Sequence, residues 1–237
     1  MTSQRPPDPQ QLNLYSYVRN NPLIYTDPNG LELYFDLQFD SKGKVKNWSD
    51  AKQYRKALEK ATGLKLEINK GTGKVTIKSE PTSLSGVASQ IKTIISDTVN
   101  TPVRIAASDN DSLVTGGRFD GGGHQTLDFA DINKLSKKNG FSKESIVVHE
   151  TTEAYEGAIN PTGTFNQFHS TAIGFENDVR AAQGLSPRGP GPETSTQPNA
   201  NGDVVVTVDF TTHIERITVN QATPGNIKKV EVLKKTP

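Results

Sequence analysis

The stretch FSKESIVVHETTEAYEG, residues Phe141–Gly157, decides how this sequence is interpreted, because a helix pattern there carries metal-binding side-chain types. Ser142 is a residue type that caps helix N-termini, and Gly157 is a residue type that ends helices. His149 and Glu153 are four positions apart, so a helix places them on one face about one turn apart. The stretch therefore predicts a helix that presents an imidazole beside a carboxylate.

The five residues from His149 to Glu153 read HETTE, a variant of the HExxH helix motif of metallopeptidases in which Glu153 replaces the second histidine. In that motif two ligands one turn apart bind one metal ion, and the glutamate after the first ligand takes a proton from the metal-bound water. We therefore predict His149 and Glu153 as metal ligands and Glu150 as the general base. The alternative interpretation is an exposed helix face on which the acids form salt bridges.

A third protein ligand is expected from the next helix, predicted at about residues 166–183. The stripe expected to face the core is His169, Ala172, Ile173, Glu176 and Val179. Burying an imidazole or a carboxylate without a partner is costly, and the short connecting loop AINPTGTFN makes the two helices neighbours. We predict His169 as the third ligand, and Glu176 as an alternative ligand or as the acceptor for a ligating imidazole.

The order of features over residues 103–184 resembles that of the zincin metallopeptidases. In this family an edge strand precedes a helix with the HExx[H/E] pattern, and a second helix carries the third ligand. The resemblance implies a zincin-like mixed sheet packed on helices, one divalent metal ion, and a protein or peptide substrate. Two imidazoles and one carboxylate suit zinc, which we expect here, and they also suit iron or manganese.

The rest of the chain predicts an α+β fold. A mixed sheet is expected from Leu31–Phe39, a hairpin at Lys65–Glu80 and the segment Val103–Phe129, packed on four or five helices. Ser49 and Asp131 are expected to cap two of these helices, Asp50–Thr62 and Asp131–Lys138. Another helix is expected around Leu84–Ile95. The strands expected at the C-terminal end are Val204–Phe210, His213–Val219 and Ile227–Leu233.

The N-terminal string NLYSYVRNNPLIYTDPNGL, within residues 12–31, closely resembles the end of the core of RHS/YD-repeat proteins, with its Asn-Pro-Leu and Asp-Pro-x-Gly-Leu signature. In such proteins the repeats form a shell around a C-terminal domain, commonly a toxin that a cognate immunity protein neutralises. The resemblance implies an effector domain that is secreted, or delivered into a target cell, as part of a larger bacterial-type RHS protein.

Four segments are predicted on this basis. Residues 1–31 would be the RHS-core end, residues 32–184 the zincin-like catalytic domain, residues 185–202 a flexible Pro/Gly-rich linker or loop, and residues 203–237 a C-terminal β-hairpin region. No apolar run reaches the length of a membrane span. The chain has no cysteine, which excludes thiolate metal sites and cysteine nucleophiles.

Two other functions stay open from the sequence. A metal-dependent nuclease could use the same histidines and acids, but the formal net charge of +1 over 237 residues makes a nucleic-acid partner unfavourable. A non-catalytic binding or adhesion domain is permitted by the altered motif, by the low mean hydropathy of −0.58 and by the many glycines and prolines. The leading hypothesis is a metal-dependent, peptidase-like hydrolase.

Overall fold

One buried helix, α5 (Lys143–Ile159), lies at the centre of the fold. A computed structural model describes residues 32–97, 101–108, 116–136, 141–220 and 227–235 of the chain. The Ser142 hydroxyl accepts the backbone N–H of Ser145 and so caps α5, as predicted. The helix continues past Gly157 and ends at Ile159, which corrects the predicted end. Gly157 is needed inside the helix, because a Cβ there would lie 2.6 Å from the ring of Phe119.

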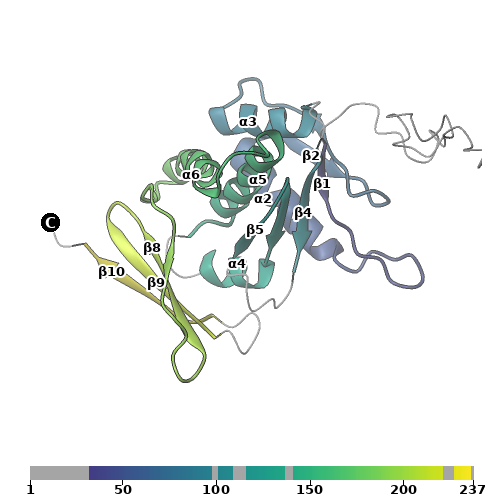
Figure 1. Cartoon of the computed structure of the whole chain (residues 1–237). Helices are drawn as coiled ribbons and strands as arrows, with labels where there is room; N and C mark the ends of the chain where they lie inside the picture. Colours follow the sequence, from purple (N-terminus) through teal and green to yellow (C-terminus); the bar gives the residue numbers. More distant parts are fainter. Residues whose placement is uncertain (1–31, 98–100, 109–115, 137–140, 221–226, 236–237) are drawn as a thin grey trace, which may run out of the picture.

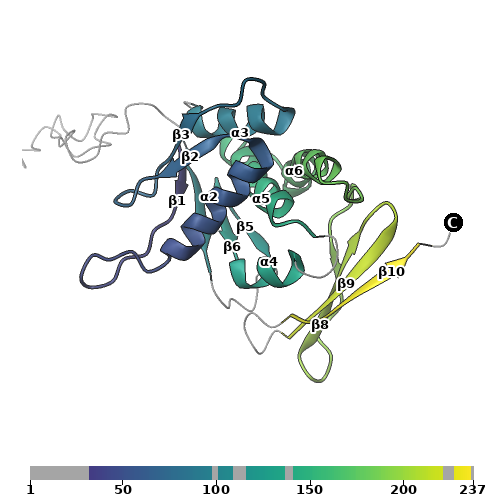
Figure 2. The same cartoon turned by 180° about the vertical axis from the view of Figure 1, so that it is seen from behind.

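A four-stranded mixed sheet packs against α5. Its order is β1 (Leu33–Phe35), β4 (Val103–Ala107), β6 (His124–Leu127) and β5 (Gly117–Gly121). The first three strands run parallel, and β5 pairs antiparallel with β6 at the edge of the sheet. Buried and half-buried residues alternate along β4, as expected for a sheet with one covered face. Figures 1 and 2 show the helices gathered on one side of these strands.

The other helices surround α5 on that side. They are α2 (Trp48–Thr62), α3 (Gly86–Ser96), α4 (Phe129–Ser136) and α6 (Phe165–Ala182). An amphipathic pattern explains each of them, and α6 buries the whole predicted stripe from His169 to Val179. Helix α6 follows α5 closely and packs along it, which brings the polar side chains of the two helices together.

Several predicted boundaries change in the structure. Helix α2 begins at Trp48, after Asn47, so Ser49 lies inside it and does not cap it. Helix α4 begins at Phe129, and its first turn is capped by the Asp128 carboxylate, which accepts the N–H of Asp131. The predicted strand Leu31–Phe39 is regular only over β1.

The hairpin at residues 65–80 also departs from the prediction. Its strands β2 (Lys65–Ile68) and β3 (Val75–Ser79) form a separate two-stranded sheet and do not join the mixed sheet. A single bridge between Tyr34 and Lys74 connects the hairpin to β1. The turn falls at residues 69–74, as the glycines at 71 and 73 predicted.

A second, antiparallel sheet closes the chain. Its order is β10 (Ile227–Lys234), β9 (His213–Asn220), β8 (Asp203–Asp209) and β7 (Thr194–Ser195). The sheet stands beside α4 and α6 in both views (Figures 1 and 2). The buried ring of Phe210 joins it to the helical layer, because this ring packs edge-on against Phe141 and under the guanidinium of Arg180.

The fold class predicted from the sequence is therefore confirmed as α+β. Within the described ranges, no helix is long and apolar enough to cross a membrane, which agrees with the prediction. The RHS-like segment, residues 1–31, lies outside the described residues.

Candidate metal centre

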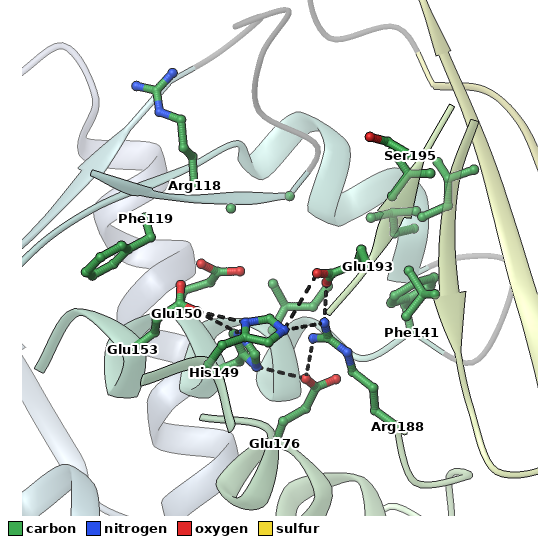
Figure 3. Close-up of a pocket in the computed structure, with 18 of the residues that line it drawn as sticks. Arg118, Phe119, Phe141, His149, Glu150, Glu153, Glu176, Arg188, Glu193 and Ser195 are labelled. Atoms are coloured by element: carbon green, nitrogen blue, oxygen red, sulfur yellow. Dashed lines mark hydrogen bonds and ion pairs between the residues drawn. The ribbon is translucent and has the colours of Figure 1, made fainter. Parts of the chain in front are cut away.

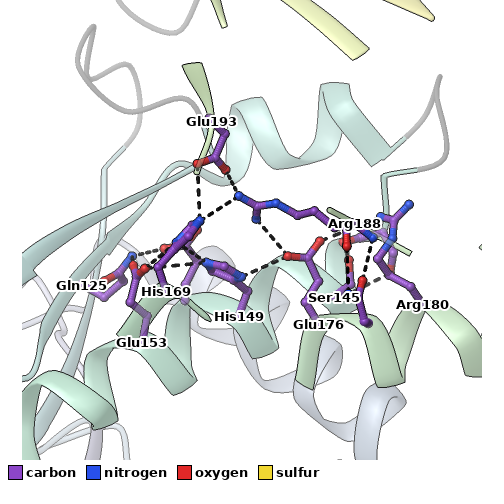
Figure 4. Close-up of polar contacts among 12 residues, drawn as sticks. Gln125, Ser145, His149, Glu153, His169, Glu176, Arg180, Arg188 and Glu193 are labelled. Carbon is purple, nitrogen blue, oxygen red and sulfur yellow. Dashed lines mark hydrogen bonds and ion pairs between the residues drawn. The ribbon is translucent and has the colours of Figure 1, made fainter. Parts of the chain in front are cut away.

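Three buried side chains from α5 and α6 converge as the sequence predicted. His149 Nε2 lies 3.2 Å from His169 Nδ1, and His169 Nδ1 lies 2.8 Å from Glu153 Oε1. The third edge of this triangle, from His149 Nε2 to Glu153 Oε1, measures 3.7 Å. Figure 4 shows the rings of His149 and His169 and the carboxylate of Glu153 close together between the two helices. One ligand atom from each side chain is thus available at a single point.

The size of this triangle fits a first-row metal ion. In a tetrahedral zinc site the bonds are about 2.0–2.2 Å long, which separates neighbouring ligand atoms by about 3.4 Å. The three measured separations lie on both sides of that value. The His149, Glu153 and His169 group could therefore hold a metal ion with small movements of the side chains.

Glu176 lies on the side of the His149 ring that faces away from the ligand triangle. Its Oε2 atom lies 3.0 Å from His149 Nδ1, the nitrogen on the far side of the imidazole ring. The same oxygen accepts a hydrogen bond of 2.9 Å from Arg188 Nη1. Of the two predicted roles for Glu176, the geometry favours the acceptor that orients a ligating imidazole over a direct ligand.

Glu150 lies next to the group on the side of the sheet. The side-chain amide of Gln125, on β6, donates to Glu150 Oε2 and also approaches Glu153 Oε2 at 3.4 Å. The carboxylate of Glu150 occupies the space beside Gly117 on β5, where a Cβ atom would lie 2.1 Å from the Glu150 carboxyl carbon. An edge strand without a side chain at this position therefore makes room for the predicted general base.

The electrostatics of the site separate the two glutamates of the motif. Burial, together with the charge of Glu153, raises the pKa of Glu150 to about 8. Burial acts in the same direction on Glu153, but hydrogen bonds from His149 and His169 outweigh it and lower its pKa. Opposite shifts of neighbouring carboxyl groups are typical of sites where one acid moves a proton and another carries fixed charge.

His149 is the most strongly perturbed imidazole of the site. Burial alone would lower its pKa, but contacts with Glu153 and Glu176 dominate and raise it to about 10. A metal ion bound at Nε2 would have to displace any proton on that nitrogen, so protonation there and metal binding exclude each other.

A cavity of about 430 Å³ opens over the group. Its polar end contains the ligand triangle, Glu150 and Arg188, and the strand β5 forms one side (Figure 3). The opposite wall is apolar and combines helix residues with the second sheet. The residues of that wall are Leu135, Phe141, Ile146, Val206, Val208 and Ile217.

Sequence reasoning missed three polar residues of the site: Gln125, Arg188 and Glu193. We expected residues 185–202 to be a linker or loop, yet Arg188 is buried from this segment against His169 and Glu176. A usable signal existed, because Arg188 and Glu193 are the two charged residues of that otherwise uncharged segment. Gln125, in an irregular hairpin, gave no such signal.

Comparison of the chain with protein families, with curated proteins and with solved structures finds no match in any of the three.

Proposed function

We propose that this chain is a metal-dependent hydrolase of the peptidase type, with His149, Glu153 and His169 as the ligands of one divalent ion. The observation that carries the proposal is the convergence of one atom from each side chain at the separations of a tetrahedral metal site. The helix spacing that places them, four residues within α5 and one facing position on α6, is the arrangement that resembles the zincins.

The charge around the triangle supports a divalent ion. Three carboxylates, Glu153, Glu176 and Glu193, surround the site, and two guanidiniums, those of Arg188 and Arg180, pair with them. When both imidazoles are neutral, the carboxylates outnumber the guanidiniums, and this negative excess favours the binding of a cation. Among these ions we propose zinc, because two imidazoles and one carboxylate form a common catalytic zinc set.

The remaining residues have roles that follow from their positions. A bound ion in such a site polarises a carbonyl and acidifies a water molecule. Glu150 receives the proton of that water, because its carboxylate stands beside the ligand group and its raised pKa allows it to hold a proton at neutral pH. Gln125 keeps the Glu150 carboxylate against Gly117.

The substrate that suits this cavity is an extended peptide. Strand β5 is the edge of its sheet and lines the cavity, so its outer backbone groups can pair with a peptide strand. The apolar wall opposite β5 can accept an apolar side chain next to the site. We propose further that the chain is the effector domain of an RHS-repeat protein, on the resemblance of residues 12–31 to the end of the RHS core.

Elemental mass spectrometry of the purified chain tests the metal site. We expect about one zinc, iron or manganese ion per chain in the wild type, and none in His149→Ala. His124→Ala is the matched control, because His124 is an exposed histidine on β6 outside the ligand group. Absence of metal from the wild type, also after incubation with Zn²⁺, would contradict the proposed function.

A further inference from the structure

Arg188 reaches the metal site from a loop that follows α6. Its side chain is 8% exposed, and its guanidinium contacts Glu176, His169 and Glu193 (Figure 4). Arg188 Nη2 lies 3.0 Å from His169 Nε2. This is the ring nitrogen of His169 that points away from the ligand triangle.

The contact between Arg188 and His169 fixes where the proton of the imidazole lies. A guanidinium has N–H donors and no acceptor, so His169 Nε2 must accept the hydrogen bond and carry no proton. The proton of the neutral ring is then on Nδ1, where it is donated to Glu153 Oε1 at 2.8 Å. In this state Nδ1 has no lone pair for a metal ion.

Metal binding requires the opposite tautomer. A ligating Nδ1 loses its proton, and the neutral imidazole then carries its proton on Nε2. An N–H on Nε2 would point at the N–H of Arg188 at 3.0 Å, so two donors would face each other. The present position of Arg188 is therefore incompatible with His169 as a ligand.

An acceptor for the second tautomer is already close. Glu193 Oε2 lies 3.7 Å from His169 Nε2, and the other oxygen of this carboxylate binds Arg188. A small displacement of the guanidinium toward Glu176 would let Glu193 accept the proton of His169. Arg188 and Glu193 are thus alternative partners for one nitrogen atom.

The backbone holds Arg188 in this position from outside the ligand group. Asn177, on α6, accepts the N–H of Arg188 at 2.7 Å and donates to its carbonyl at 3.0 Å. A bridge to Phe210 and a hydrogen bond from Gly189 to Asp209 attach the same segment to the C-terminal sheet.

We propose that Arg188 is an internal cation that competes with the metal ion for His169, and that metal loading replaces Arg188 by Glu193 at His169 Nε2. The inference rests on the proposed metal site and adds its regulation. Anything that moves the segment around Arg188 toward or away from the site would change the affinity for metal without changing the ligands.

The experiment measures Zn²⁺ affinity of the full chain by competition with a chromophoric chelator. Arg188→Met, which keeps an apolar stem and removes the donors, should bind Zn²⁺ about tenfold more tightly than the wild type. Partners of ligating histidines change metal affinity by about this factor, and the sign is reversed here because Arg188 opposes the ligating tautomer of His169. Glu193→Gln should bind more weakly. Arg118→Met is the matched control, because Arg118 also lines the cavity and its loss removes the same charge without touching His169.

A structural readout separates this competition from a general effect of charge. Two-bond ¹H–¹⁵N NMR spectra should show His169 Nε2 without a proton in the metal-free wild type, and Nε2 protonated after Zn²⁺ is added. Asn177→Ala loosens the segment and leaves every ligand in place, so its Zn²⁺ affinity should also rise, which keeps the proposal testable if Arg188→Met does not fold.

The outcomes distinguish the two proposals. Stoichiometric Zn²⁺ binding that is equal or weaker in folded Arg188→Met and in Asn177→Ala would overturn the competition and leave the metal site standing. Equal tightening in Arg118→Met, with no change of the His169 tautomer, would also overturn it. Failure of every variant and of the wild type to bind Zn²⁺ would overturn both proposals.

Discussion

Glu150 is placed by its neighbours, since its own motif fixes only where it lies on the helix. Gln125 donates to its carboxylate, and the missing side chain of Gly117 leaves the space that the carboxylate fills. Glu153, one turn away on the same helix, is held instead by two imidazoles. Two glutamates of the same helix thus have different environments, and the proposed roles of Glu150 as general base and Glu153 as ligand rest on this difference.

Replacing Glu150 by glutamine should therefore separate metal binding from hydrolysis. We expect Glu150→Gln to retain its metal and to lose peptide hydrolysis by about 10²–10⁴-fold, because the acceptor of the proton is removed. The measurement is metal content together with cleavage of a peptide library. Glu156→Gln, farther along α5, is the control. Full activity in Glu150→Gln would exclude it as the general base.

A second residue-scale prediction concerns Glu215, which is fully buried on β9. Burial raises its pKa to about 7, and Arg180 only partly opposes this shift. The folded state thus favours the protonated acid, so its stabilising contribution is complete below about pH 4.5 and is lost as pH rises through 7. We expect Glu215→Gln to match the wild type in urea unfolding at pH 4.5.

At pH 8 the same variant should be more stable than the wild type by about 1–3 kcal/mol, because the amide stays neutral where the carboxylate ionises. An identical loss of stability between the two pH values in both proteins would show that Glu215 does not contribute.

The positions of the candidate ligands were predictable at this scale, and that of Arg188 was not. Helix periodicity fixes which side chains share a face, so the positions of His149, Glu153 and His169 followed from spacing alone. Arg188 comes from a loop, where no period relates sequence to direction. Its position depends on two hydrogen bonds between its backbone and the side chain of Asn177, and no local sequence pattern predicts these bonds.

At the scale of elements, the close approach of β5 to α5 depends on glycine. A methyl group at position 117 would collide with the Glu150 carboxylate, and one at position 157 would collide with Phe119. Two glycines, one on each element, thus set the distance between the edge strand and the helix that carries the motif.

Gly117→Ala tests this dependence. The fold should be retained, because the clash is with one side chain, but Glu150 must move and hydrolysis should fall by at least about tenfold, as misplacement of a catalytic group does. Circular dichroism and peptide cleavage are the measurements. Gly174→Ala on α6 meets nothing within 4 Å and should instead stabilise the chain by about 0.5–1 kcal/mol. Unchanged cleavage by Gly117→Ala would show that the contact has no role.

Element prediction from the sequence worked where one face of a helix is apolar, and was less accurate at the ends. The extent of α6 agrees closely with the predicted residues 166–183. The end of α5 was predicted too early, because Gly157 serves packing against Phe119 and does not terminate the helix. The hairpin at residues 65–80 was assigned to the wrong sheet, because its two strands pair with each other and a local strand pattern does not show whether a hairpin also joins a larger sheet.

For the whole molecule, the attachment of the second sheet depends on Phe210. Its ring is fully buried between Phe141 and Arg180. We expect Phe210→Ala to lower the free energy of unfolding by about 3–5 kcal/mol, measured by urea denaturation. The exposed Phe39 supplies the control Phe39→Ala, for which little change is expected. A loss below about 1 kcal/mol in Phe210→Ala would show that the sheet is held elsewhere.

The overall class was predictable, but the position of the C-terminal sheet was not. Strand and helix periods are local and give an α+β fold, whereas contacts such as Phe210 with Phe141 join residues far apart in sequence. The cavity could not be predicted from the sequence either, because its wall combines Ile146 of α5 with Val208 and Ile217 of the C-terminal sheet.

Arg188 follows all three candidate ligands in the sequence, so it is synthesised after them. A ribosome makes His169 19 residues before Arg188, an interval of about 1–4 s at usual rates of synthesis. On the proposed competition, the three ligands are synthesised before their competitor. Metal supplied during synthesis would meet them without it, whereas metal supplied to the finished chain has to displace Arg188 from His169.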